Sequence, residues 1–151
     1  MGRKNVIGLI AEFETSKGVA YSLCTHEERE HGPLVYLYPI GTLLSELKDT
    51  TPQFCCFCRL RALLRRKTWK EVGKMEIPLQ LKDFPVFRVG LALTPGSPKV
   101  ACWWFWDGEK EWPVGEITDE QRKMPIRSIW GEILITERLE EGYTAEKHPL
   151  I

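Results

Sequence analysis

The aromatic run at residues 100–106 limits the fold of this chain more than any other segment. Its last four residues read Trp-Trp-Phe-Trp, and Asp107-Gly108 follows directly. Aromatic side chains favour extended strands, and an Asp-Gly pair after such a run is a strong short-range signal for a hairpin. We therefore predict a strand over residues 100–106, a two-residue type I′ turn at Asp107-Gly108 and a return strand over residues 109–114.

The alternation of a strand divides these aromatic rings between two faces. Trp103 and Phe105 share one face, whereas Trp104 and Trp106 share the other. One pair can fill a core, and Trp112 on the return strand can lie beside a pair as a cross-strand neighbour. Because exposed tryptophan is favoured at binding hot spots, we treat Trp104 and Trp106 as candidate partner-binding residues. Core packing is the alternative for most of these rings.

Other β-prone segments recur along the chain, bounded by polar or turn-forming residues. Strands are predicted over residues 5–12, 18–24, 34–40, 54–58, 69–77, 84–91 and 129–139. Short helices are predicted over residues 43–48 and at a capping box that begins at Thr118. Another is predicted where Leu60, Leu63 and Leu64 fall at the i, i+3 and i+4 spacing of a helix. The pattern predicts an α+β, β-dominated fold: a curled antiparallel sheet or small open barrel with two or three short helices. We expect a single globular domain over residues 1–141 and a C-terminal tail over residues 142–151.

The charge balance argues against a protein that coats DNA. The chain has 21 Lys plus Arg and 21 Asp plus Glu, so its formal net charge is zero, whereas a DNA-coating protein carries a positive excess. No stretch approaches the roughly 20 apolar residues that span a bilayer. The apolar run near the N-terminus is interrupted by Glu12, so no signal peptide is indicated. We expect a cytoplasmic protein with no membrane partner; the oligomeric state stays open.

Five cysteines, an odd number, indicate reduced thiols in a chain long enough to form a core. Cys55 and Cys58 have the Cys-x-x-Cys spacing of a metal knuckle, but a structural zinc site needs four ligands. The other possible ligands do not repeat that spacing: Cys24, His26, His31 and Cys102. We therefore expect these cysteines to act as small apolar side chains, with no metal and no cofactor.

A nucleophilic site would need a thiol or hydroxyl held by a histidine. Cys24 and His26 are two residues apart and would share one face of a strand, so a thiolate–imidazole pair is a catalytic alternative. Neither a nucleophile elbow nor a Gly-rich phosphate loop accompanies it in the sequence. We predict no catalytic residues, and hence a protein that is not an enzyme.

Residues 59–70 carry six positive side chains and no negative one. If the leucines of this segment face inward, Arg59, Arg61, Arg65 and Arg66 form a basic patch on the exposed face. Such a patch can hold phosphates or an acidic protein. The alternative interpretation is a solvated helix face that acidic residues elsewhere balance.

The polar segment 25–33 is predicted to be a loop, with Glu27, Glu28 and Glu30 crowded into four residues. Like charges this close repel each other, but they would complement a basic cleft on a partner. We therefore assign partner binding to these glutamates and to His26. A solvated loop whose acids offset Arg29 is the alternative.

Several short motifs resemble a known family. They lie at residues 104–112, 114–118 and 125–127 and at Trp130, together with residues 18–21 and 25–26 near the start. In these motifs the chain resembles small bacterial immunity proteins of polymorphic toxin systems, the immunity protein 26-like family. The resemblance implies a β-rich core with tryptophan signatures, a cognate toxin as partner, and no catalytic residues. The cysteine-rich segment 54–58 departs from that pattern.

The expected function is therefore neutralisation of a cognate toxin domain by direct occlusion, without turnover. Nucleic acid is not the expected partner. The alternative is a nucleic-acid-binding β-barrel module that uses the basic run at residues 59–70 and surface aromatics for phosphate contact and stacking.

Overall fold

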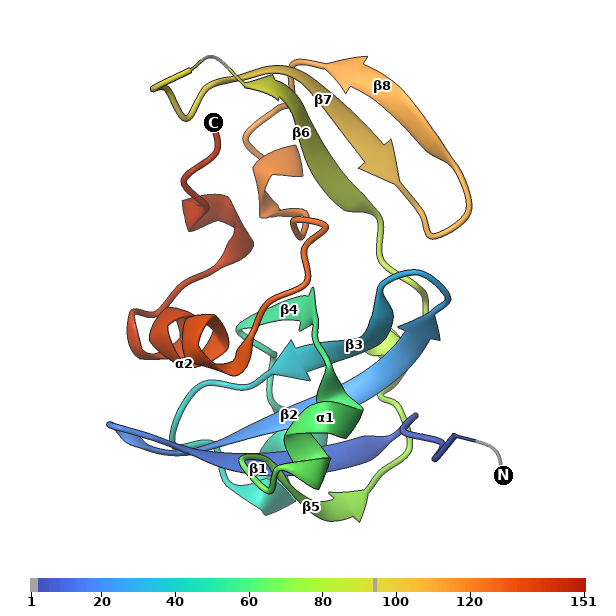
Figure 1. Ribbon diagram of the computed structural model, residues 1–151, viewed down its shortest axis with the longest axis vertical. Helices are drawn as coiled ribbons and strands as arrows, with labels where there is room; N and C mark the ends of the chain where they lie inside the picture. Colours follow the sequence, from blue (N-terminus) through green and yellow to red (C-terminus); the bar gives the residue numbers. More distant parts are fainter. Residues whose placement is uncertain (1–2, 94) are drawn as a thin grey trace.

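The computed structural model describes residues 3–93 and 95–151 as a β-dominated α+β fold (Figure 1). The larger antiparallel sheet has the order β4-β3-β2-β1-β5 and the smaller one the order β6-β7-β8. The strands of the larger sheet are β1 (Leu9–Thr15), β2 (Gly18–Glu28), β3 (Gly32–Leu37), β4 (Phe54–Phe57) and β5 (Lys70–Lys74). The strands of the smaller sheet are β6 (Phe87–Leu93), β7 (Val100–Trp106) and β8 (Glu111–Gly115).

The helices are short. Two are α-helical, α1 (Leu60–Arg65) and α2 (Glu132–Glu140). Four are 3-10 turns: η1 (Leu44–Asp49), η2 (Leu79–Leu81), η3 (Gln121–Lys123) and η4 (Ala145–Lys147). The predicted β-dominated α+β class is confirmed, but the strands form two open sheets in place of one curled sheet or small open barrel. Within the described residues, no helix is long and apolar enough to cross a membrane.

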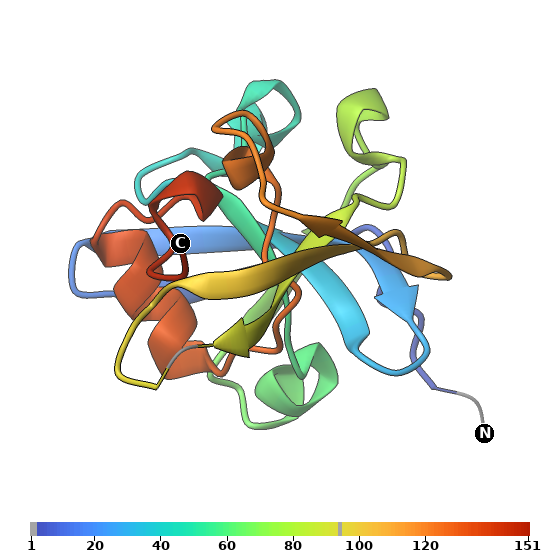
Figure 2. The ribbon, with the colours of Figure 1, turned by 90° about the horizontal axis from the view of Figure 1, so that it is seen from above.

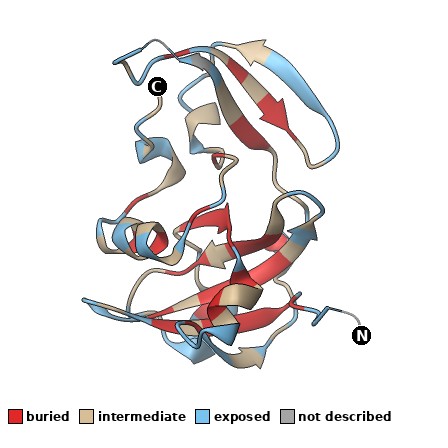
Figure 3. Ribbon diagram, viewed as in Figure 1, coloured by how far each residue is buried: buried red, intermediate tan, exposed pale blue. Residues whose placement is uncertain are grey.

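The main core lies on the face of the larger sheet that α1 and α2 cover (Figures 1 and 3). Alternate residues of β1, namely Leu9, Ala11 and Phe13, point into it, as the two-residue period of a strand requires. Phe13 stacks on Trp69 with ring centroids 4.3 Å apart. The opposite face of the same sheet buries Ile10 in a smaller cluster, so the larger sheet is covered on both sides.

The segment 129–139 is predicted as a strand, but from Glu132 onward it belongs to α2. Its isoleucine content suggests a strand, but its buried side chains follow a helical spacing: Ile135 and Leu139 are four residues apart and both lie in the main core. Ile133, on the opposite side of the helix, is 73% exposed. Tertiary packing of the Ile135–Leu139 face therefore overrides the local β preference.

The C-terminal segment, predicted as a tail, lies against the rest of the domain. Tyr143 is buried and packs on Phe54 and Trp130, and the backbone N–H of Val100 donates to the carbonyl of Ile151 over 2.6 Å. Figures 1 and 2 show α2 and the C-terminal segment on the same side of the molecule. Residues 142–151 thus connect α2 to the smaller sheet.

The predicted β7–β8 hairpin is present, but its turn differs from the prediction. The N–H of Asp107 donates to the carbonyl of Lys110 over 3.1 Å, so Gly108 and Glu109 occupy the centre of the turn. Gly108 has a φ of 97°, whereas Asp107 and Glu109 do not have positive φ. The Asp107 carboxylate instead accepts hydrogen bonds from the N–H groups of Glu109 (2.9 Å) and Lys110 (2.7 Å). A type I′ turn needs positive φ at both central residues, and here only Gly108 has it, so the type I′ prediction is wrong. Asp107 closes the turn with its side chain instead.

An aromatic cluster joins the two sheets. Phe57 of β4 packs on Phe87 of β6 and Trp106 of β7, with ring centroids 5.2 and 6.0 Å apart. Phe84, before β6, lies 5.5 Å from Trp106. This aromatic cluster fixes the smaller sheet over β3 and β4, with the β7–β8 turn facing the end of the β2–β3 hairpin (Figure 1).

Candidate functional site

The β2–β3 turn separates two cavities of opposite charge. We call the first the acidic cleft: it has a volume of about 670 Å³ and lies between the β2–β3 turn and the β7–β8 turn. Six carboxylate side chains line it: Glu27, Glu28, Glu30, Asp107, Glu109 and Glu111. We call the second the arginine pocket: it has a volume of about 700 Å³ and lies between the β2–β3 turn, α1 and the N-terminal residues.

The segment predicted as a loop at residues 25–33 is mostly strand. β2 continues to Glu28, and Glu28 pairs directly with Gly32 of β3. A bulge between Cys24 and His26 shifts the register, and Gly32 has a φ of 85°, which glycine adopts at little cost. The glutamates therefore lie on and beside a tight hairpin turn and not on a long loop, and this gives them fixed positions.

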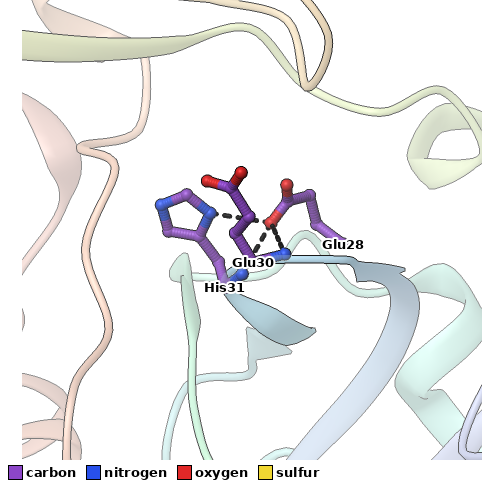
Figure 4. Close-up of side chains that lie close together, drawn as sticks. All are labelled: Glu28, Glu30 and His31. Carbon is purple, nitrogen blue, oxygen red and sulfur yellow. Dashed lines mark hydrogen bonds and ion pairs between the residues drawn. The ribbon is translucent and has the colours of Figure 1, made fainter.

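Glu28 holds that turn together (Figure 4). Its Oε2 accepts hydrogen bonds from the N–H of Glu30 (2.9 Å), the N–H of His31 (2.6 Å) and the ring Nδ1 of His31 (2.7 Å). Burial raises the pKa of the Glu28 carboxyl, but the hydrogen bonds from His31 and Glu30 together outweigh burial and hold that pKa below its ordinary value. The repulsion expected within this acidic segment is thus offset locally.

His31 anchors the turn to the aromatic cluster. Its ring centroid lies 4.8 Å from Trp106 and 5.1 Å from Phe57. Trp106 is 6% exposed, so it forms a wall of the acidic cleft from within the core. The Arg127 guanidinium also lies 5.2 Å from the Trp106 ring and pairs with Glu111 at 3.0 Å. The cleft is therefore built on rigid packing.

Glu27 links the two cavities. Its carboxylate accepts hydrogen bonds from both terminal nitrogens of Arg61, with Nη2 and Oε1 2.8 Å apart. The Nη1 atom of Arg3 lies 3.7 Å from the Oε2 atom of Glu27. The hydrogen bond from Arg61 is the main reason that the pKa of Glu27 is lowered. Glu27 is therefore already partnered, whereas Glu30 and Glu109 are exposed and form no ion pair within the described part of the chain.

The structure brings together four of the six predicted partner-binding residues. Glu27, Glu28, Glu30 and Trp106 all line the acidic cleft, but His26 and Trp104 do not. The His26 ring contacts the carbonyl of Lys82 through Nε2 (2.7 Å) and the Thr25 hydroxyl through Nδ1 (2.8 Å). Trp104 is half-buried on β7.

Sequence reasoning missed the contribution of the β7–β8 turn to this site. Asp107, Glu109 and Glu111 make the segment visibly acidic in the sequence. Its position opposite Glu30, however, depends on the aromatic packing between the two sheets, which sequence spacing does not show.

The basic run is divided by the fold. α1 buries Leu60 and Leu63, as its amphipathic spacing predicts. Arg59, Arg61 and Arg65 line the arginine pocket, where Arg3, Lys4 and Arg29 join them. Arg66 is exposed and lies outside the pocket.

Cys24 and His26 do not form a reactive thiolate–imidazole pair. Burial raises the pKa of the Cys24 thiol to about 12 and that of Cys55 to about 12, so both are protonated at neutral pH. The Cys24 thiol donates to the backbone carbonyl of His26 at 3.5 Å, while the His26 ring is held by Lys82. The described residues contain no disulfide.

One group of three metal-type ligands occurs among the described residues: Glu28, Glu30 and His31, whose ligand atoms lie within 4.8 Å of one another (Figure 4). The Oε2 atom of Glu28 is already engaged by three N–H donors of the turn. The hydrogen bonds that close the hairpin therefore account for the approach of these side chains.

No family model, no curated protein and no solved structure matches this chain.

Proposed function

We propose that this protein is a bacterial immunity-type binding protein, which neutralises a cognate toxin domain by placing the acidic cleft over a basic surface. The observation that carries the proposal is the gathering of six carboxylate residues from two separate turns around one cavity. Among the residues that line the cleft, the permanent cations are Arg29 and Arg127, and Arg61 and Arg3 from outside its lining pair with Glu27 alone. The resemblance of residues 104–112, 114–118 and 125–127 to immunity proteins implies the same kind of partner.

The charge of the cleft suits fast and selective association. Complementary charge raises association rates and disfavours partners with the wrong charge. Glu30 and Glu109 stand exposed on opposite turns, so both can pair with cations of a partner that enters between them. A toxin domain that handles nucleic acid needs a positively charged surface to hold phosphates, and such a surface fits this cleft.

The cleft is also preorganised. Glu28 fixes one turn through three hydrogen bonds, and Asp107 fixes the other through two. Because little ordering remains to be done when a partner docks, less binding free energy is lost to entropy.

The proposal predicts that a toxin domain is encoded next to this gene, and the experiment uses that domain. Co-expression should protect cells from that toxin, and the two purified proteins should form a stoichiometric complex. The double substitution Glu30→Lys and Glu109→Lys should weaken both complex formation and protection. The matched control is Glu116→Lys with Glu141→Lys, which makes the same charge change at exposed positions outside the cleft. Full protection by the cleft variant would contradict the proposal.

A further inference from the structure

The arginine pocket gathers cations from three separate segments. The N-terminal residues supply Arg3 and Lys4, the β2–β3 turn supplies Arg29, and the α1 segment supplies Arg59, Arg61 and Arg65. Glu30 is the one acidic residue among those that line it. This cavity lies on the other side of the β2–β3 turn from the acidic cleft. A ligand bound in it would therefore be distinct from the toxin partner proposed for the cleft.

Part of this positive charge is structural. Arg61 pairs with Glu27, and its Nε and Nη2 also donate to the backbone carbonyl of Lys4 at 3.1 and 2.8 Å. Lys4 in turn pairs with Glu71. Arg61 thus ties the N-terminal segment to α1 and forms a fixed wall of the pocket.

The remaining charge has no partner among the described residues. Arg29, Arg59 and Arg65 are exposed and form no ion pair there. Cations that line one cavity repel each other, and an anion between them relieves that repulsion. Guanidinium groups present planar pairs of donors that match phosphate oxygens.

The pocket also has an apolar wall. Leu64 is half-buried, and Ile129 is 49% exposed although it lies beside the core residue Trp130. The bridge between Phe57 and Ile129 holds the backbone of Ile129 at this place. A simple inorganic anion would leave this wall uncovered, whereas a ligand that joins an anionic group to a flat apolar ring would cover it.

We propose that the arginine pocket binds a nucleotide, with its phosphates on Arg29, Arg59 and Arg65 and its base against Leu64 and Ile129. A volume of about 700 Å³ lies within the range of small-ligand sites. Several negative charges close together, as in a di- or triphosphate, match three arginines around one cavity better than the widely spaced carboxylates of a peptide do. The proposal concerns binding alone.

Calorimetric titration of the full chain with ATP, adenosine, pyrophosphate and an eight-residue oligothymidylate tests it. ATP should bind with 1:1 stoichiometry, and adenosine and pyrophosphate should each bind about tenfold or more weakly, because each lacks one half of the contacts. The oligonucleotide should bind no more tightly than ATP.

Two double variants locate the site. Arg59→Gln with Arg65→Gln should weaken ATP binding about tenfold or more, since two phosphate partners are lost. Arg66→Gln with Lys70→Gln removes the same charge from exposed positions outside the pocket and should leave ATP affinity within about twofold. Thermal melting of both variants checks that they fold.

Four results would overturn the proposal. The absence of saturable ATP binding would exclude the site, and equal weakening by the two variants would show unspecific charge attraction. Pyrophosphate binding as tightly as ATP would indicate a phosphate site without a base contact. Tighter binding of the oligonucleotide, weakened by the Arg66 and Lys70 changes, would indicate a nucleic-acid surface. None of these results depends on whether the toxin binds the acidic cleft.

Discussion

Removal of the Glu28 side chain should open the β2–β3 turn and lower the free energy of unfolding. The Oε2 atom of Glu28 accepts three hydrogen bonds, and its side chain is 13% exposed, so water replaces these contacts poorly. A hydrogen bond to a charged group contributes about 1.5–3 kcal/mol. Three bonds at one oxygen are not additive, so we expect Glu28→Ala to cost about 2 kcal/mol in total.

Urea unfolding at pH 7, followed by tryptophan fluorescence, measures this loss. With a slope of about 2 kcal/mol per molar urea, the midpoint should fall by about 1 M. Glu28→Gln keeps one acceptor oxygen without the charge and should cost about half as much. Glu30→Ala is the matched control on the same turn, because its exposed side chain holds no turn hydrogen bond in the described structure.

The pH dependence gives a second reading of the same contacts. The pKa of Glu28 is lower in the folded state than in the unfolded state. Its stabilisation is therefore present above the unfolded value of about 4.3 and is lost as the pH falls through the folded pKa. Glu28→Gln should remove this dependence. A stability of Glu28→Ala within about 0.5 kcal/mol of the parent, or an equal loss in Glu30→Ala, would refute this account of the turn.

Three further predictions follow from burial. Trp106→Ala should cost about 3–5 kcal/mol of unfolding free energy because the ring is enclosed by the aromatic cluster. Trp112 is 38% exposed, so Trp112→Ala should cost about 1 kcal/mol in the same urea assay. Burial, followed by the charges of Arg88 and Arg138, lowers the pKa of His148 to about 4. Between this pKa and the unfolded value of about 6.5, the unfolded chain binds a proton that the folded chain does not, so His148 should reduce stability as the pH falls through this range. Thermal melts of His148→Gln over the same range should show a smaller decline. Under native conditions Cys102, the half-buried thiol, should be alkylated first, as mass spectrometry of peptides can show, and faster labelling of the buried cysteines would contradict the packing described.

Local sequence signals predicted several elements well. The aromatic run at residues 100–106 forms β7 with the predicted bounds. The capping box at Thr118 is present, with hydrogen bonds of 2.9 Å from the N–H of Thr118 to the Gln121 side chain and 3.1 Å from the N–H of Gln121 to the Thr118 hydroxyl. The capping-box contacts join residues three apart, and β7 pairs with its neighbours along the chain, β6 and β8, so local patterns are enough to indicate both features.

Other features depend on partners far away in the sequence. The helix α2 forms where isoleucines favour a strand, because Ile135 and Leu139 fit the core made by the larger sheet. The acidic cleft exists because Phe57 and Trp106 pack together and bring two turns face to face. Neither contact is visible in local periodicity, which is why half of the carboxylates of the cleft were missed.

The central claim, that the acidic cleft binds a basic partner, is tested most directly by the salt dependence of the association rate with the proposed cognate toxin domain. Stopped-flow measurements on the parent should show a rate that falls steeply as salt rises, because steering by complementary charge is screened. Glu30→Lys with Glu109→Lys should associate more slowly at low salt and lose most of that dependence, while Glu116→Lys with Glu141→Lys should resemble the parent. Association rates and salt slopes that are the same in all three proteins would contradict the claim.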